Sequence, residues 1–134
     1  MRVAARVLDA YSLITYFEGE SGKDKMIEIF REARDGASPL LVSVVNWGEV
    51  FHITLREAGM ERANQVAHLI STLPIRLISA DLEQARQAAE FKASRKMSYA
   101  DCFAAALAKL RKAELVTGDK EIIQIEGEVN ILWI

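Results

Sequence analysis

The hydrophobic pattern of the chain alternates between short apolar runs and longer amphipathic segments. Apolar runs rich in β-branched residues predict buried strands at residues 3–8, 40–45, 75–79, 115–117 and 129–134. Apolar positions spaced by three and four predict helices at residues 10–18, around 26–33, and at 46–58, 60–73, 81–96 and 99–112, with a short helical turn after 119. Alternating strands and helices are typical of a parallel sheet that helices cover on both faces. We therefore predict a single α/β domain over residues 1–134.

Polar residues mark where the helices begin. Ser98 and Asp101 have the spacing of a capping box, and so do Asn46 and Glu49. The serine that opens residues 21–24 is expected to cap the helix after it in the same way. These patterns predict where the helices start, and they also offer a purely structural role for two of the acids.

Composition and charge narrow the classes of function. The chain has 17 basic and 19 acidic residues, which excludes a globally basic nucleic-acid-binding protein. It has a single cysteine, Cys102, which is expected to be a buried apolar residue in a reducing compartment. No run approaches the ~18 apolar residues of a membrane span, and the N-terminus lacks a signal-peptide pattern. The sequence therefore predicts a cytoplasmic protein with no membrane association.

Four acids stand where the predicted strands leave the sheet. Asp9 follows the first strand, Glu49 follows the second by a few residues, and Asp119 follows the fourth. Asp101 begins the helix that leads into the fourth strand; that helix runs antiparallel to the strand, so its start lies over the strand's carboxyl end. In open α/β sheets, ligands bind outside these carboxyl ends. We therefore expect the four carboxylates to converge on one edge.

Converging carboxylates need a counter-charge. Like charges a few ångströms apart raise one another's pKa, and a divalent cation removes this cost. Oxygen ligands without His or Cys indicate Mg²⁺ or Mn²⁺ rather than Zn²⁺. Such ions orient phosphates and generate an attacking hydroxide. The pattern predicts phosphodiester hydrolysis, although each acid also has a structural explanation as a helix cap or a loop acceptor.

Five segments, taken in order, resemble the PIN-domain ribonucleases, and within them the VapC-type toxins of toxin–antitoxin pairs. The segments are VLDAYSLITYFEGE, SVVNWGEVFHITLREAG, SYADCFAAALA, LVTGDKEI and the closing ILWI. The resemblance implies a PIN-like three-layer α/β/α domain with a central, mainly parallel five-stranded sheet. It also implies a Mg²⁺-dependent endoribonuclease that acts on RNA, forms a homodimer and is neutralised by a cognate VapB-like antitoxin.

The resemblance assigns roles position by position. Asp9, Glu49, Asp101 and Asp119 match the family's acidic quartet and are its expected catalytic residues. Asp9 and Asp101 are the most direct metal ligands, and Glu49 and Asp119 complete the cluster directly or through water. Thr117 matches a hydroxyl residue near the fourth acid that orients a ligand or phosphate. Two positions depart from the pattern. Many relatives carry a small hydroxyl residue two places after the first acid, where this chain has a tyrosine, and an aromatic residue after the TGDKE-type segment, where this chain has Ile122.

Two further interpretations stay open at this stage. Arg95 and Lys96 come just before the helix of Asp101, where they either contact RNA phosphates or form an ordinary solvated helix end.

The alternative to an enzyme is a catalytically silent PIN-like binding protein whose acids serve folding. A dinucleotide-binding enzyme is excluded because the turn after the first strand, DAYSL, is not glycine-rich.

Overall fold

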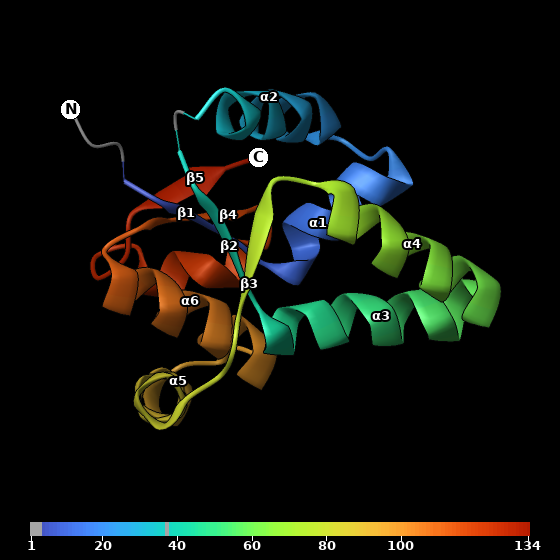
Figure 1. Ribbon diagram of the computed structural model, residues 1–134. Helices are drawn as coiled ribbons and strands as arrows, with labels where there is room; N and C mark the ends of the chain where they lie inside the picture. The colour runs from blue at the N-terminus through green and yellow to red at the C-terminus, as the bar shows by residue number, and fades with distance from the viewer. Residues whose placement is uncertain (1–3, 37) are drawn as a thin grey trace.

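A five-stranded parallel sheet forms the centre of the molecule (Figure 1). The computed structural model describes residues 4–36 and 38–134. The strands are β1 (Arg6–Leu8), β2 (Leu40–Ser43), β3 (Ile75–Ile78), β4 (Glu114–Thr117) and β5 (Ile131–Trp133). Their order across the sheet is β3-β2-β1-β4-β5, and every neighbouring pair is parallel. This confirms the predicted α/β class and sheet; Val3 in the first predicted strand and Ala37 in the predicted break before the second lie outside the described residues.

Helices cover both faces of the sheet. They are α1 (Ala10–Glu18), α2 (Lys23–Arg34), α3 (Val44–Ala58), α4 (Met60–Thr72), α5 (Leu82–Ser94), α6 (Tyr99–Arg111) and the 3₁₀ helix η1 (Lys120–Ile125). Successive residues of a strand point to opposite faces, so Val7 packs with α5 and α6 while Leu8 packs with α1 to α4. The result is the expected three-layer arrangement with one apolar core on each side of the sheet (Figure 1).

The register of the central strands brings their carboxyl ends to one edge. Leu8, the last residue of β1, pairs with Val116 of β4, and Val7 pairs with Leu41 of β2. The chain leaves β1 at Asp9, which follows its last residue directly. The edge therefore collects the residues that follow β1, β2 and β4, as the sequence predicts.

Two helix starts differ from the sequence-based expectation. The second strand ends at Ser43 rather than at residue 45, and the Ser43 Oγ accepts a hydrogen bond from the Val45 amide at 3.1 Å, which makes Ser43 the N-cap of α3. Asn46 and Glu49 thus lie inside the helix and form no capping box. The predicted cap at Ser21 is also wrong: α2 begins after Gly22, whose φ of 102° favours glycine, and no side chain caps it.

Helix α6 is the most deeply buried of the helices. Every residue from 101 to 108 is buried, including Cys102, because a run rich in alanine lets the helix lie close to the sheet. The predicted cap at its start is confirmed, since the Ser98 Oγ accepts a hydrogen bond from the Asp101 amide at 3.1 Å. In the described part of the chain, no helix combines the length and apolarity needed to span a bilayer.

Candidate metal centre

Asp9 lies fully buried at the end of the central strand. One carboxylate oxygen accepts a hydrogen bond from the Ser12 amide at 2.8 Å, so Asp9 caps α1. The other oxygen accepts a hydrogen bond from the Thr117 hydroxyl on β4. The Ser12 hydroxyl in turn donates to the Asp9 carbonyl oxygen at 2.9 Å. The cap and the bond across the two strands fix both carboxylate oxygens of Asp9.

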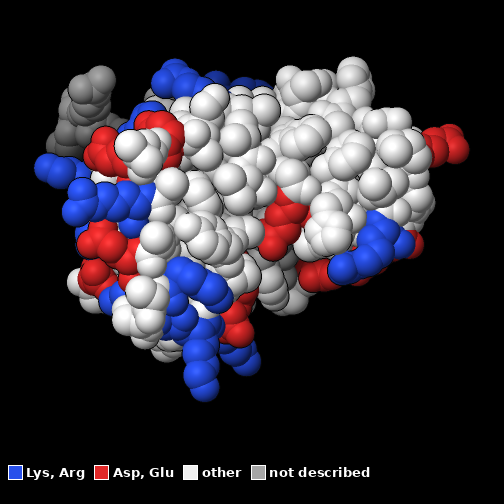
Figure 2. Space-filling model, turned by 90° about the horizontal axis from the view of Figure 1, so that it is seen from below, with Lys and Arg blue, Asp and Glu red and all other residues white. Residues whose placement is uncertain are grey.

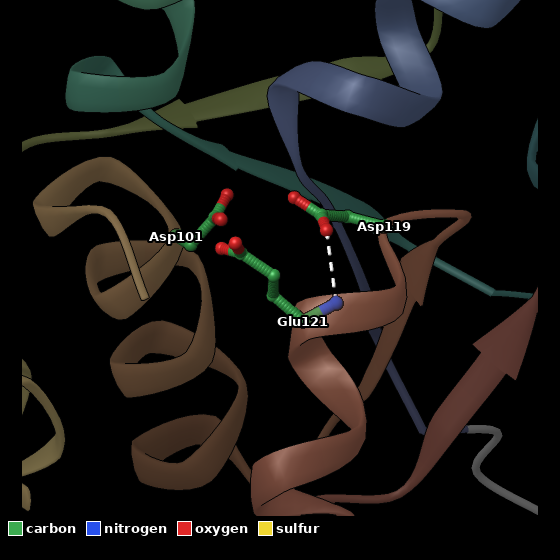
Figure 3. Close-up of side chains that lie close together, drawn as sticks. All are labelled: Asp101, Asp119 and Glu121. Atoms are coloured by element: carbon green, nitrogen blue, oxygen red, sulfur yellow. Dashed lines mark hydrogen bonds between the residues drawn. The ribbon is translucent and has the colours of Figure 1, made fainter. Parts of the chain in front are cut away.

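Asp119 and Glu121 come from the segment that follows β4. Asp119 is the N-cap of η1, and one of its carboxylate oxygens accepts a hydrogen bond from the Glu121 amide at 3.0 Å. The Asp119 amide donates to the Thr117 hydroxyl at 3.0 Å. This tight turn brings the side chain of Glu121 back toward Asp119 (Figure 3).

Asp101 completes a group of three carboxylates with these two residues. It projects from the first turn of α6, and Figure 3 shows all three side chains directed into one space. Asp101, Asp119 and Glu121 each offer an oxygen within 4.8 Å of the other two. The structure therefore brings together acids from two segments that are separate in the sequence.

Glu49 approaches the same group from α3. It is half-buried and lines the same pocket as the three carboxylates. On the preceding turn of the helix, the fully buried Asn46 donates its side-chain amide to the Ala100 carbonyl oxygen at 3.0 Å. This hydrogen bond joins α3 to the start of α6, and so it holds Glu49 and Asp101 on facing sides of the pocket.

Four of the acids, Glu49, Asp101, Asp119 and Glu121, line an open pocket of about 340 Å³, whereas the fully buried Asp9 does not line it. Figure 2 views the carboxyl edge of the sheet: acidic side chains appear in a hollow amid uncharged surface, and Lys and Arg gather mainly toward the edges of this view. Among the described residues, those that line the pocket include no Lys or Arg. No ion pair found in the described part of the chain involves Asp9, Glu49, Asp101, Asp119 or Glu121. Among the described residues, no Lys or Arg therefore neutralises the acids at the pocket, although His52 lies near enough to Glu49 to oppose the rise in the pKa of that acid.

Burial and mutual repulsion raise the pKa of three of the acids. Burial raises the pKa of Asp9 to about 7, although the hydrogen bonds from Thr117 and Ser12 partly oppose the rise. Burial is the largest cause that raises the pKa of Asp101, and repulsion from Asp119 and Asp9 adds to it, so that this pKa is about 8. Burial also raises the pKa of Glu49, and the Asn46 amide partly offsets this. The metal-free site therefore resists full ionisation near neutral pH.

The donor set fits a hard divalent cation. The carboxylates offer only oxygen ligands, and Mg²⁺ and Mn²⁺ prefer such ligands. A cation bound among Asp101, Asp119 and Glu121 would replace the repulsion with attraction. Asp9 and Glu49 lie outside that group of three; the predictions that they ligate metal and act in catalysis remain predictions.

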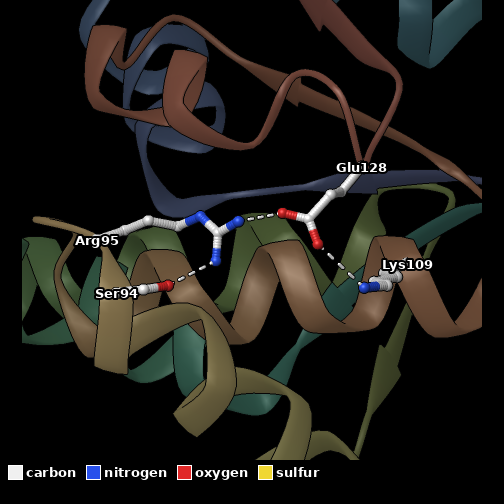
Figure 4. Close-up of polar contacts among 4 residues, drawn as sticks. All are labelled: Ser94, Arg95, Lys109 and Glu128. Carbon is white, nitrogen blue, oxygen red and sulfur yellow. Dashed lines mark hydrogen bonds and ion pairs between the residues drawn. The ribbon is translucent and has the colours of Figure 1, made fainter.

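Arg95 and Lys96 do not line the pocket. The Arg95 guanidinium pairs with Glu128, which also pairs with Lys109 at 3.2 Å (Figure 4). Arg95 additionally donates to the Ser94 hydroxyl at 3.0 Å. The backbone amide of Lys96 donates to the side-chain oxygen of Gln124 at 3.0 Å. Contact of the two basic residues with RNA phosphates stays a prediction.

Sequence reasoning missed Glu121 and Asn46. Glu121 follows Asp119 by two residues, and only the turn that caps η1 brings the two side chains together. An available signal was the acidic pair itself directly after a buried strand. Asn46 was assigned to a cap, whereas Ser43 three residues earlier ends the strand and caps the helix instead.

Comparison with known proteins places this geometry in a family. The model of the PIN domain matches residues 6–128. No curated protein matches the sequence at a significant level.

Solved structures share the fold at low identity. VapC20 of Mycobacterium tuberculosis, a toxin that cleaves the sarcin–ricin loop, is 15% identical with a TM-score of 0.73, covering 93% of this chain and 97% of its own. VapBC2 of Rickettsia felis, solved with a fragment of its promoter DNA, is 11% identical with a TM-score of 0.77, covering 97% and 98%. A toxin–antitoxin complex from Klebsiella pneumoniae is 19% identical with a TM-score of 0.72, covering 96% of each chain. The family model spans nearly the whole chain and the fold agrees with it, so this chain belongs to the PIN domain family.

Proposed function

We propose that this protein is a VapC-type, Mg²⁺-dependent endoribonuclease that hydrolyses RNA phosphodiester bonds and is neutralised by a cognate VapB-like antitoxin. The observation that carries the proposal is the group formed by Asp101, Asp119 and Glu121, with Asp9 and Glu49 beside it and no basic side chain among the described pocket residues. Asp101 is buried, Asp119 is half-buried and Glu121 is exposed, and a negative group that is partly buried in this way favours a bound cation over an empty state.

Each side chain of the site has a distinct task in this proposal. Asp101, Asp119 and Glu121 hold the cation, and Asp9 and Glu49 complete the negative field around it. The Thr117 hydroxyl donates to the Asp9 carboxylate and accepts a hydrogen bond from the Asp119 backbone amide, so it sets the relative position of the two acids. When bound, Mg²⁺ lowers the pKa of an attacking water and stabilises charge on the phosphate. The open pocket leaves the cluster accessible to a strand of RNA.

The proposed partners rest on the structural neighbours. They include the toxin–antitoxin complex from Klebsiella pneumoniae and VapBC-5 of Mycobacterium tuberculosis, a member of the VapBC family of toxin–antitoxin systems. We extend this association to the present chain and expect it to form a homodimer as well. Light scattering of the purified protein measures the oligomer, and co-purification with the product of an adjacent small reading frame tests the antitoxin.

A catalytically silent PIN-like binding protein is the alternative. In that case the acids would serve folding, as the caps at Asp9, Asp119 and the start of α6 suggest. Against this, burial and like charges raise the pKa of Asp9 and Asp101, so their ionised forms cost stability near neutral pH. If the acids served folding alone, the protein would be more stable with fewer carboxylates at this edge of the sheet.

The test compares RNA cleavage and metal binding in Asp9→Asn and Asp101→Asn. We expect both variants to fold and to lose cleavage, and we expect Mg²⁺ or Mn²⁺ to raise the melting temperature of the wild type but much less that of Asp101→Asn. Asp81→Asn is the matched control, because Asp81 caps α5 away from the pocket and asparagine caps equally well. Cleavage by both variants at the wild-type rate would refute the proposed mechanism. A wild type that neither cleaves RNA nor gains stability from either ion would favour the silent binding protein.

A further inference from the structure

We propose that Tyr11 is a substrate-contacting residue that packs against a nucleobase of the RNA bound beside the acidic cluster. The inference rests on the proposed ribonuclease function and adds to it a residue that recognises substrate. Tyr11 lies in the first turn of α1, two residues after Asp9, and lines the pocket that also contains Asp101 and Asp119.

The position of the Tyr11 ring depends on a glycine. Its Cδ1 and Cζ atoms each lie 3.1 Å from the point that a Cβ on Gly118 would occupy, and Cε1 lies closer still. Any side chain at residue 118 would therefore displace the ring. Gly118 directly precedes Asp119, so the ring lies against the backbone that carries one of the three clustered carboxylates. Tyr11 and Gly118 form a complementary pair at the wall of the pocket.

The ring is held in place but not covered. Tyr11 is 43% exposed, although it packs against the backbone at Gly118. Within the described residues its hydroxyl has no hydrogen-bond partner. A buried packing residue would lose far more of its surface to neighbours. The exposed part of the ring therefore remains available to a ligand in the pocket.

The lining of the pocket combines the two kinds of surface that a nucleotide needs. Asp101, Asp119 and Glu121 would hold a cation and, through it, a phosphate. Tyr11, Ile14 and Ile53 add apolar side chains to the lining of the same pocket. A nucleotide presents a charged phosphate and, a few ångströms away, a flat base whose faces are apolar. Aromatic side chains stack on the unpaired bases of single-stranded RNA, whatever the base, because every base has a π-face.

The experiment measures the affinity of single-stranded RNA by fluorescence anisotropy. The probes are 12-nucleotide oligomers of A, U or C, with Ca²⁺ as the divalent ion and the integrity of the RNA checked on a gel. Tyr11→Ala is expected to weaken binding about tenfold, the effect typical of losing one base–aromatic contact. Tyr11→Phe keeps the ring and is expected to restore most of the affinity. An oligomer with abasic sites should bind the wild type and Tyr11→Ala with nearly equal affinity.

Gly118→Ala tests the same contact without changing the tyrosine. It should displace the ring and weaken binding in the wild-type background, and it should have little further effect in the Tyr11→Ala background. Tyr99→Ala is the matched control: Tyr99 is 48% exposed in the first turn of α6, packs on Phe103 and does not line the pocket. We expect the control to bind RNA as tightly as the wild type.

The outcomes separate this inference from the proposed function. If the wild type binds and cleaves RNA and Tyr11→Ala binds it equally well, the role of Tyr11 is wrong and the ribonuclease proposal stands. Additive effects of Gly118→Ala and Tyr11→Ala would also overturn the inference, since the two changes would then act independently. A wild type that binds no RNA would overturn both proposals.

Discussion

The Thr117 hydroxyl donates a hydrogen bond to the carboxylate of Asp9, although the two residues lie 108 positions apart in the chain. The same hydroxyl oxygen accepts a hydrogen bond from the Asp119 amide at 3.0 Å. One fully buried side chain therefore links the acid that follows β1 to the acid that follows β4.

Thr117→Val is expected to destabilise the protein and to shift the pKa of Asp9. The change leaves Asp9 with one donor fewer and leaves the Asp119 amide without its acceptor, which costs about 1–3 kcal/mol of the free energy of unfolding. Because the Thr117 hydrogen bond lowers the pKa of Asp9, its loss should raise that pKa above about 7. Denaturant unfolding measures the first effect and the pH profile of cleavage the second. Thr117→Ser keeps the hydroxyl and should stay close to the wild type; equal stability of the valine and serine variants would contradict this role.

Stability of the metal-free protein should fall as the pH rises from about 4 to about 8. The pKa of Asp9 is about 7 and that of Asp101 about 8 in the folded protein, against about 4 in an unfolded chain. The folded state therefore binds more protons than the unfolded state in this window, and the stability that protonation contributes is lost as the pH approaches the folded pKa values. Melting temperatures in EDTA at pH 5 and pH 8 measure the effect.

The same melting curves with Mg²⁺ provide the control. A bound cation favours the ionised carboxylates, so stabilisation by Mg²⁺ should be larger at pH 8 than at pH 5. Asp101→Asn removes one of the repelling charges and should flatten the dependence in EDTA. A metal-free protein that becomes more stable between pH 5 and pH 8 would be inconsistent with the raised pKa values.

Asn46→Asp should destabilise the protein in a pH-dependent manner. The substitution keeps the shape of the side chain but loses the amide that donates to the Ala100 carbonyl oxygen. At low pH the protonated carboxyl can still donate to that oxygen, whereas at pH 8 a buried negative charge would face Glu49 and Asp101. Urea unfolding at pH 5.5 and pH 8 should show a larger loss at the higher pH. An equal loss at both values would mean that Asn46 does not act on the acidic cluster.

Gln124→Ala should lower the affinity for metal while changing the free energy of unfolding comparatively little. The Gln124 side chain accepts from the Lys96 amide at 3.0 Å and donates to the Lys96 carbonyl oxygen at 3.2 Å, so it joins the segment before α6 to η1. The two joined elements carry Asp101 and Glu121. We expect Mn²⁺ affinity, measured by calorimetry, to fall about tenfold, at the lower end of the effects of residues that position ligands.

The controls for Gln124 are an exposed glutamine and a partial replacement. Gln65→Ala removes an exposed side chain whose partner is Arg62 on α4, and it should leave Mn²⁺ affinity unchanged. Gln124→Glu keeps the acceptor for the Lys96 amide and loses the donor to the Lys96 carbonyl oxygen. The Mn²⁺ affinity of this variant should therefore lie between that of the wild type and that of Gln124→Ala. Unchanged Mn²⁺ affinity in Gln124→Ala would rule out the positioning role.

The sheet and its acidic edge were predictable because both follow from local pattern. Strands and helices alternate, and a helix that returns antiparallel to its strand must begin over the strand's carboxyl end, which correctly placed Asp101 near Asp119. The cap at Ser98 was equally predictable, since its signal lies within four residues.

The rest depended on contacts that no local pattern contains. Asn46 has the spacing of a cap, but Ser43 accepts the hydrogen bond from the Val45 amide and caps α3, while the Asn46 side chain bonds to the Ala100 carbonyl oxygen of α6. Glu121 joins the carboxylate group only because η1 turns tightly after Asp119. Arg95 is an exposed cation by sequence, yet its partner Glu128 lies 33 residues away. Each of these side chains is placed by a neighbour that is distant in the sequence or by the conformation of a turn.

The pairing of β1 with β4 sets the order in which the site forms during synthesis. Asp9 leaves the ribosome long before Thr117, Asp119 and Glu121, because the Asp9–Thr117 pair alone spans 108 positions. Strand β4 then pairs with β1, which closes a large loop of chain, and β5 pairs with β4 after that. A nascent chain that stops short of β4 contains the first acid and none of the last two. The complete set of acids therefore assembles only after β4 has been made and has paired with β1.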